Sequence, residues 1–256
     1  MSSPPLPGEL RFWPELAALL SDPRFWSPAR KRSRQPVLLI PGFLAGDASL
    51  TVMAGWLRRR GHRVRTSGIH LNVGCSGRDL DRLDAALTAF DEPVVIIGQS
   101  RGGTLARALA ARHPDRVAAL VTLGSPVLDP LAVSSSVLAT IRSVAFLGDL
   151  GVPGLFSTAC RDGDCCAEFR SLLTAPLPEG APALALYSRT DAIVDWRACL
   201  DPAAECVEID GSHCGMAVNA QVYRELERLI DEAPPSGAAD PCSKAPPSGA
   251  ADPCSK

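Results

Sequence analysis

The chain has 256 residues, of which 46% are hydrophobic and 21% are charged, and its formal net charge at pH 7 is -2. This length allows one large domain or two small ones, and the apolar content is sufficient for a buried core. A nearly neutral chain has no global field that would attract a polyanion, so we expect no nucleic-acid partner. The sequence leaves the oligomeric state open.

The sequence also excludes a transmembrane segment, because no apolar run reaches the roughly 18 residues that a membrane span requires. The nearest candidate, 131–156, is interrupted by Arg142 and Asp149. The first twenty residues lack the basic region and the small-residue cleavage site of a signal peptide. We therefore expect a cytoplasmic protein, with secretion an option only if the native N-terminus differs.

Aromatic residues gather near the N-terminus, at Phe12, Trp13, Phe25 and Trp26, and we expect them to pack onto the domain rather than bind a membrane. Residues 233–256 are the dodecamer APPSGAADPCSK written twice. Its Pro, Gly, Ser and Ala content cannot bury a core, so we expect a disordered tail. The folded domain is expected to cover 1–232, and whether the duplication is native is left open.

Short apolar runs alternate with helical periodicity between Pro36 and Glu232. We predict strands at 36–40, 62–66, 93–97, 117–123, 183–187 and 206–209. Amphipathic helices follow the first three of these strands, one of them from about 101 to 112, and a last helix includes Val222 and Leu226. This alternation predicts an α/β fold with a mostly parallel central sheet, flanked by helices on both faces.

The segment from about 127 to 176 interrupts this alternation. It contains weakly amphipathic helical runs, a Gly/Pro break at 151–154 and three cysteines. One interpretation is a helical cap or lid insertion over one end of the sheet, with apolar residues such as Leu138 and Phe146 lining a pocket. The other interpretation is a pair of ordinary packing helices, and the sequence does not decide between them.

The pentapeptide Gly98-Gln99-Ser100-Arg101-Gly102 directly follows the most apolar predicted strand and directly precedes a helix. A serine nucleophile has to stand on a tight, strained turn, and glycines two residues away on either side let the strand and the helix approach without Cβ clashes. The N-terminal end of the helix also favours a developing oxyanion. Ser100 is therefore the predicted nucleophile.

A serine hydroxyl needs a base to accept its proton and a carboxylate to orient that base. Of the four histidines, His213 lies in a Gly-flanked loop between the last strand and the last helix, and we predict that it is the base. The acid should lie between the serine and the histidine in chain order. Asp191, near the carboxyl end of the preceding strand, is the first candidate, and Asp195 is the second.

An oxyanion needs two hydrogen-bond donors. The backbone N–H of Arg101, the residue after the nucleophile, is the first, and the loop after the first strand should supply the second, for which Phe43 is the best candidate. The side chain of Arg101 would place a cation at the mouth of a pocket. It could there favour acidic or polar substrates, or form an outward salt bridge.

Four motifs, VLLIPGF at 37–43, IIGQSRGG at 96–103, YSRTDAIVDW at 187–196 and GSHCGM at 211–216, resemble those of bacterial serine esterases and lipases of the α/β-hydrolase superfamily, such as triacylglycerol lipases. The resemblance covers about 36–232. It implies an α/β-hydrolase fold with an eight-stranded type of sheet, a triad of Ser100, Asp191 and His213, and oxyanion donors at Phe43 and Arg101. The implied substrate is a small-molecule ester, and no cofactor is implied.

The implied reaction is hydrolysis of carboxylic esters through an acyl-enzyme. Alternatives are an acyltransferase or thioesterase that uses the same triad, or a non-catalytic binder of a small apolar ligand. The acyl-chain length, and with it the choice between a lipase and a short-chain esterase, depends on how 127–176 folds and is left open.

Seven of the nine cysteines precede the repeated tail, and three of them, Cys160, Cys165 and Cys166, lie close together. This cluster resembles a metal or disulfide site. Zinc sites favour a pair of cysteines with a second pair elsewhere, and no second pair is evident, so we expect no metal site. A disulfide, for example between Cys199 and Cys206, is left open.

Overall fold

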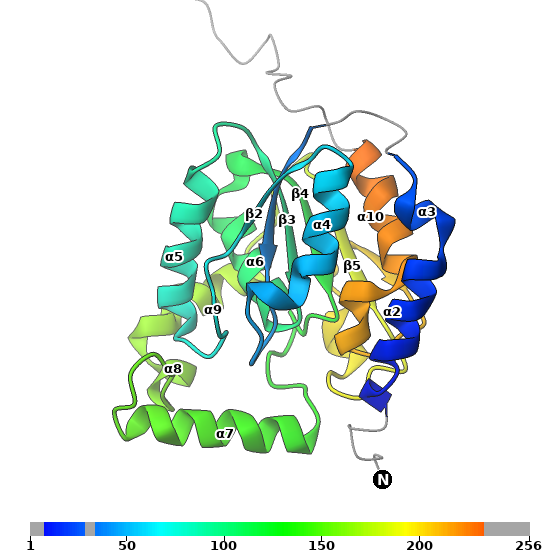
Figure 1. Cartoon of the computed structure of the whole chain (residues 1–256). Coiled ribbons are helices and arrows are strands. Elements are labelled where there is room, and N and C mark those ends of the chain that lie inside the picture. Colours follow the sequence, from blue (N-terminus) through cyan, green and yellow to red (C-terminus); the bar gives the residue numbers. More distant parts are fainter. Residues whose placement is uncertain (1–7, 29–33, 233–256) are drawn as a thin grey trace, which may run out of the picture.

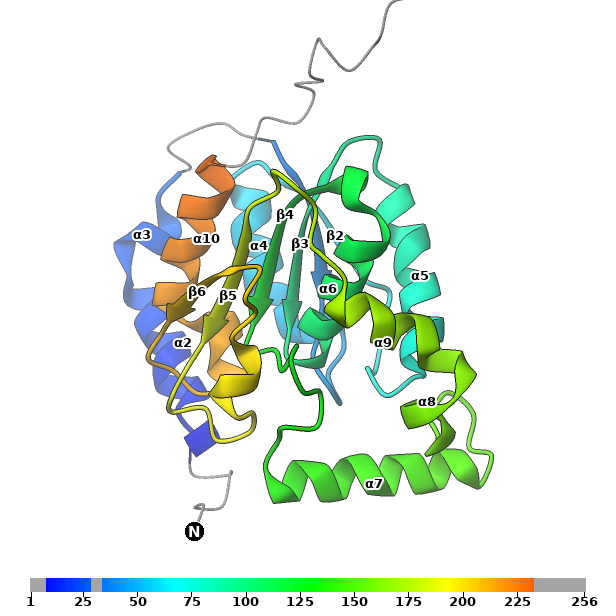
Figure 2. The same cartoon turned by 180° about the vertical axis from the view of Figure 1, so that it is seen from behind.

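The computed structural model describes residues 8–28 and 34–232. One sheet of six parallel strands, in the order β2-β1-β3-β4-β5-β6, forms its centre (Figures 1 and 2). The strands are β1 Pro36–Ile40, β2 Arg63–Thr66, β3 Val94–Gln99, β4 Val117–Leu123, β5 Ala183–Tyr187 and β6 Glu205–Glu208. The predicted α/β class with a parallel sheet is confirmed.

Helices cover both faces of the sheet (Figure 1). One face carries α2 Phe12–Ser21, α3 Pro23–Trp26, α4 Thr51–Arg59 and α10 Ala220–Glu232, and the other carries α5 Ser76–Thr88, α6 Arg101–Arg112 and α9 Ala167–Thr174. The remaining helices are α7 Ser135–Asp149, α8 Ala159–Asp162 and the 3-10 turns η1 Asp47–Leu50, η2 Pro114–Arg116, η3 Asp164–Cys166, η4 Trp196–Cys199 and η5 Cys214–Val218.

The central strands are apolar along their whole length because both of their faces are covered. Every residue of β1, β3 and β4 is buried. Neighbouring side chains of a strand point to opposite faces, so Val37 and Leu39 enter one core and Leu38 and Ile40 the other. This burial anchors the carboxyl ends of the strands, the edge at which α/β sheets carry their functional groups.

The sheet differs from the eight-stranded type that the resemblance implied. The described residues form six strands, all parallel to their neighbours. Residues 12–26, ahead of β1, fold as the helices α2 and α3 instead of adding strands. The expected packing of the N-terminal aromatic residues is confirmed for Phe25, which is buried, and for Phe12, which packs against the core. Trp26 is largely exposed but packs on the ring of Phe25, and Trp13 is the most exposed of the four.

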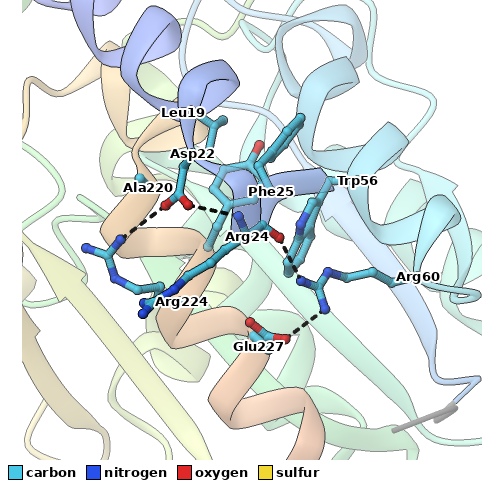
Figure 3. A pocket seen from close by; sticks show the side chains of 10 residues that line it. Leu19, Asp22, Arg24, Phe25, Trp56, Arg60, Ala220, Arg224 and Glu227 are labelled. Atoms are coloured by element: carbon cyan, nitrogen blue, oxygen red, sulfur yellow. Dashed lines mark hydrogen bonds and ion pairs between the residues drawn. The ribbon is translucent and has the colours of Figure 1, made fainter. Parts of the chain in front are cut away.

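The N-terminal helices attach to α4 and α10 around a small pocket (Figure 3). Arg60 Nη1 lies 2.8 Å from Glu227 Oε1, and Arg224 Nη1 lies 3.6 Å from Asp22 Oδ2. The ring of Phe25 also meets the ring of Tyr223 edge to face. None of the predicted site residues lines this pocket, so its contacts serve to hold α2 and α3 on the domain.

The β4–β5 segment, residues 124–182, contains α7, α8, η3 and α9. Its α9 packs on α5 and α6 through the buried residues Phe169 and Leu173. In both views α7 lies beyond the end of the sheet at which the strands terminate, toward the side of α5 and α8 (Figures 1 and 2). Phe146 and Leu150 of this region are 61% and 66% exposed, an unusual state for large apolar side chains.

No helix among the described residues has the length and apolar character to cross a bilayer.

The two glycines that flank Ser100 lie where the backbone of β3 and α6 approaches other chain segments. A Cβ atom added to Gly98 would lie 2.3 Å from the carbonyl oxygen of Gly102. A Cβ atom added to Gly102 would lie 2.3 Å from the carbonyl oxygen of Ile40. Since these neighbours are backbone atoms of a strand and a helix, they cannot move aside individually.

We expect Gly102→Ala to lower the free energy of unfolding by about 1–3 kcal/mol, because the added methyl group forces α6 away from β1. Urea unfolding followed by circular dichroism would measure the change. Gly55→Ala in α4 is the matched control, since the nearest atom to its added Cβ is the flexible end of Arg59 at 3.7 Å. Alanine favours a helix interior, so the control should be neutral or more stable. Equal stability of Gly102→Ala and the unmodified protein would contradict the steric argument.

Candidate active site

Ser100 occupies the turn between the end of β3 and the start of α6. Its φ of 52° and ψ of -125° lie in a region that non-glycine residues rarely adopt, at a cost of about 1–3 kcal/mol. The turn is held by a 2.8 Å hydrogen bond from the Ser100 N–H to the carbonyl of Leu123 and by a 2.9 Å bond from the Gly103 N–H to the carbonyl of Ser100. This strained turn places a half-buried hydroxyl at the carboxyl edge of the sheet.

His213 and Asp191 form a buried pair at the same edge. Nδ1 of His213 lies 2.6 Å from Oδ2 of Asp191, and the two side chains are only 6% and 2% exposed. The other carboxylate oxygen of Asp191 accepts hydrogen bonds of 2.8 Å each from the backbone N–H groups of Ile193 and Val194. Because Oδ1 is fixed in this way, Oδ2 is directed at the imidazole.

The loop of His213 is tied to the turn of Ser100. The side chain of Gln99 donates from Nε2 to the carbonyl oxygen of His213 over 3.1 Å. Gly124, which follows the adjacent strand β4 with a φ of +54°, leaves room for the imidazole, because a Cβ there would lie 3.2 Å from His213 Nδ1. Within the described residues no hydrogen bond joins the Ser100 hydroxyl to His213, a contact that often tightens only with substrate bound.

The environment of His213 favours its protonated form. Burial alone lowers the pKa of His213, but the nearby Asp191 carboxylate, its hydrogen bond to Nδ1 and the charge of Glu9 together raise the pKa above the ordinary value. A base with a raised pKa binds the proton of an attacking hydroxyl more strongly. The same shift extends the pH range over which the imidazole is protonated and cannot accept that proton.

Asp195, the second candidate for the acid, does not contact the imidazole. Its Oδ1 accepts a 3.0 Å hydrogen bond from the backbone N–H of Arg197 at the start of η4, and its side chain is 49% exposed. His113, at the end of α6, contacts Asp84 over 2.8 Å. Of the two predicted carboxylates, the structure therefore brings Asp191 to His213.

The loop after β1, in which we predict the second oxyanion donor, lies beside the serine. A Cβ atom at Gly42 would lie 3.2 Å from Cβ of Ser100. Asn72 holds this loop through two hydrogen bonds. Its side-chain Nδ2 donates to the carbonyl of Pro41 over 2.7 Å, and its backbone carbonyl accepts from the N–H of Leu44 over 3.4 Å. The backbone N–H groups of Phe43 and Arg101 donate to no carbonyl or side chain within the described residues.

The expectation for the Arg101 side chain is wrong. Its guanidinium turns into the loop between β2 and α5, where it contacts the Asn72 side chain and donates to the carbonyl of Gly74 over 2.7 Å. It also lies 3.4 Å from a carboxylate oxygen of Asp79, which is itself buried. A guanidinium with these partners neither presents a cation at a pocket mouth nor forms an outward salt bridge.

Two glutamates near the N-terminus, which are not among the predicted site residues, hold the His213 loop. Glu9 accepts from the backbone N–H groups of His213 at 3.2 Å and Cys214 at 2.7 Å. Glu15 accepts from the N–H of Ser212 at 2.8 Å and from its hydroxyl at 3.0 Å. A Cβ at Gly215 would overlap Glu15 Oε2, so glycine is needed there for the carboxylate to enter.

Removing the charge of Glu9 should change the pH dependence of His213. Glu9 raises the pKa of His213, so Glu9→Gln should lower it and shift the acidic limb of kcat/KM to lower pH, since less imidazole is protonated at a given pH. A pH–rate profile on a p-nitrophenyl ester would measure the shift. Glu92→Gln, beside Arg63 at the opposite end of the sheet, is the control and should leave the limb in place. An unchanged or upward-shifted limb in Glu9→Gln would contradict the role of this charge.

Comparison with known proteins finds relatives for part of the chain. A family model described as alpha/beta hydrolase fold matches residues 77–144. A triacylglycerol lipase of Pseudarthrobacter phenanthrenivorans is 31% identical over 170 residues, covering 56% of this chain and 51% of the lipase. A triacylglycerol lipase of Burkholderia plantarii has the same identity over the same length, covering 46% of that lipase. The chain thus spans about half the length of the curated relatives it matches.

Solved structures support the fold over a larger part of the chain. A metagenomic carboxyl esterase superposes with a TM-score of 0.61 at 14% identity, covering 91% of this chain and 96% of the esterase. A lipase of Bacillus licheniformis in its mature form gives a TM-score of 0.56 at 15% identity, with coverage of 80% and 96%. The thioesterase domain of the curacin biosynthetic pathway gives 0.52 at 17% identity, with coverage of 79% and 93%. At these identities the likeness concerns the fold.

Proposed function

The chain has the α/β-hydrolase fold, and from this premise we propose that it hydrolyses carboxylic esters through an acyl-enzyme formed on Ser100. One observation carries the proposal: the strained turn of Ser100 lies at the same sheet edge as the buried His213–Asp191 pair, whose imidazole and carboxylate are 2.6 Å apart. The three residues follow β3, β5 and β6 in the order serine, aspartate, histidine, the order found in α/β hydrolases.

In the proposed reaction, His213 Nε2 accepts the proton of the Ser100 hydroxyl while the oxygen attacks the ester carbonyl. Asp191 keeps the proton of the imidazole on Nδ1, so that Nε2 is the basic nitrogen. The N–H groups of Phe43 and Arg101 stabilise the oxyanion of the tetrahedral intermediate. His213 then protonates the leaving alcohol, and water, activated by the same imidazole, releases the acid and frees Ser100.

The β4–β5 segment supports the proposal that the substrate is an ester with an apolar acyl chain. The ring of Phe156 lies 6.2 Å from the ring of Phe43, so this segment reaches the proposed oxyanion loop. Leu44 and Leu71 are exposed near that loop, and Leu128 and Leu131 are exposed in the β4–β5 segment. In the proposed complex, these exposed apolar side chains contact the acyl group. We propose that residues 127–176 act as a cap over the site.

The proposal is tested by hydrolysis of p-nitrophenyl esters with acyl chains from acetate to palmitate. Turnover that rises with chain length is expected, because each buried methylene contributes about 0.8 kcal/mol of binding. A p-nitrophenyl phosphonate should inactivate the enzyme by forming one adduct on the Ser100 peptide, as read by mass spectrometry. Parallel assays with acyl thioesters, and with an alcohol as acyl acceptor, separate ester hydrolysis from the thioesterase and acyltransferase alternatives. Turnover of thioesters alone, or a phosphonate adduct on another residue, would refute the proposal.

A further inference from the structure

Four cysteine side chains converge outside the proposed active site. Cys75 precedes α5, whereas Cys160, Cys165 and Cys166 belong to α8 and η3 of the β4–β5 segment. Their four Sγ atoms all lie within 4.8 Å of one another. The distances include 3.4 Å between Cys75 and Cys166, 3.7 Å between Cys160 and Cys165, and 3.9 Å between Cys165 and Cys166. The proposed ester hydrolysis uses none of these thiols.

This spacing is that of the corners of a metal-centred tetrahedron. Zinc–sulfur bonds of about 2.3 Å place neighbouring sulfurs of a regular tetrahedron about 3.8 Å apart. A disulfide requires about 2.05 Å between sulfurs, and all four residues are free thiols in the structure. Four sulfur ligands in tetrahedral arrangement select zinc among the common divalent ions. We propose that Cys75, Cys160, Cys165 and Cys166 bind one zinc ion in a closed, structural site.

The surroundings of the sulfurs suit thiolate ligands. The backbone of Gly77 and Arg78 lies close to the sulfur of Cys75, and that of Gly77 also lies close to the sulfur of Cys166. Backbone N–H groups around the ligands of a metal site help to orient them. Gly77 permits this approach, because a Cβ there would lie 2.0 Å from the carbonyl oxygen of Cys165.

The guanidinium of Arg101 lies beside the proposed site and offsets part of its negative charge. Four thiolates around Zn²⁺ leave two excess negative charges, and each thiol releases its proton to solvent as its sulfur binds, without electron transfer. Arg101 donates to the carbonyl of Gly74 and to the hydroxyl of Ser76, the two residues on either side of Cys75. The exposed side chain of Cys165 offers the ion a path from solvent.

The ion would join two distant parts of the chain. Between the loop that contains Cys75 and the β4–β5 segment, the structure also has a 2.8 Å hydrogen bond from the N–H of Phe156 to the carbonyl of Val73. Zinc binding would add a far stronger link, since the ligands are assembled only in the folded state and binding energy becomes folding energy. It would fix the α8–η3 part of the β4–β5 segment on the domain and leave α7 outside the fixed part.

Metal analysis of the full chain, purified under reducing conditions from zinc-supplemented cells, tests the inference. We expect one zinc per chain in the unmodified protein and loss of that zinc in Cys166→Ser and in Cys165→Ser. Cys206→Ser is the matched control for the exposed Cys165 and should keep its zinc. A double variant Cys242→Ser/Cys254→Ser should also keep it, which separates the cluster from the thiols of the repeated tail. These readouts do not depend on ester hydrolysis, so failure of one proposal is distinguishable from failure of the other.

If the cluster variants fail to fold, the unmodified protein still decides the question. Removal of zinc with a chelator under reducing conditions, followed by addition of Co²⁺, should produce the visible bands of tetrahedral cobalt thiolate. Four fewer thiols should react with a thiol reagent when zinc is bound than after chelation. Two disulfides among the four residues in protein purified with its thiols protected, or four reactive thiols that bind neither Zn²⁺ nor Co²⁺, would overturn the proposal.

Discussion

Replacing Ser100 with alanine is expected to lower kcat/KM on the best p-nitrophenyl ester by about 10⁴- to 10⁶-fold, because nucleophile and base act as a unit and neither works alone. The residual rate would come from the oxyanion donors and from substrate binding. The assay is steady-state release of p-nitrophenol over a range of enzyme concentrations, with unfolding curves recorded for each variant. An alanine at position 100 would keep the same backbone φ of +52°, so the substitution adds no backbone strain. The fold should therefore be retained.

Ser125→Ala is the matched control for this substitution. Ser125 lies just after β4, at the same edge of the sheet, and its hydroxyl donates to the carbonyl of Leu123 over 3.2 Å. Its removal costs one neutral hydrogen bond, about 1 kcal/mol of stability, and should leave most of the turnover. Turnover that survives Ser100→Ala would exclude the acyl-enzyme route. Ligand binding without turnover, unaffected by Ser100→Ala, would instead favour the non-catalytic binder.

Local sequence patterns determine the elements around Ser100, which is why they could be predicted closely. The strand at 36–40 and the helix at 101–112 have the bounds of β1 and α6. The strand is a continuous apolar run and the helix is amphipathic, and each has glycine or proline near its ends. A fully buried strand and a helix buried on one face can be recognised from these local patterns, without knowledge of distant residues. The order of Ser100, Asp191 and His213 along the chain likewise sufficed to propose which side chains meet.

Contacts between distant segments could not be predicted in this way. Glu9 and Glu15 reach the His213 loop across about 200 residues, and a single glutamate in or ahead of an apolar helix carries no signal of what it will contact. The direction of the Arg101 side chain depends on Asp79 and on a loop whose path the sequence does not reveal. Cys75 was absent from the predicted cysteine cluster for the same reason, since it joins the other three only in the folded chain.

Asp191→Asn is expected to reduce kcat by about 10³- to 10⁴-fold, and the hydrogen bonds of Asp191 explain why. Its Oδ1 accepts hydrogen bonds from the backbone N–H groups of Ile193 and Val194, and the side-chain oxygen of an asparagine would take the same position. The NH₂ group of that asparagine would then face His213. A donor opposite Nδ1 stabilises the tautomer with the proton on Nε2. An imidazole in that form cannot accept the proton of Ser100, although the geometry of the site is preserved.

The pH–rate profile separates this effect from damage to the fold. The Asp191 carboxylate raises the pKa of His213, so its neutralisation should lower that pKa and move the acidic limb of the residual activity to lower pH. Asp195→Asn, which neutralises a carboxylate four residues away that contacts Arg197 instead of the imidazole, should change kcat by no more than a few-fold and leave the limb in place. A larger loss in Asp195→Asn than in Asp191→Asn would transfer the role of the acid to Asp195. The two variants remove the same charge from one loop, and a shift of the acidic limb in Asp191→Asn alone would assign the effect to the carboxylate that contacts His213.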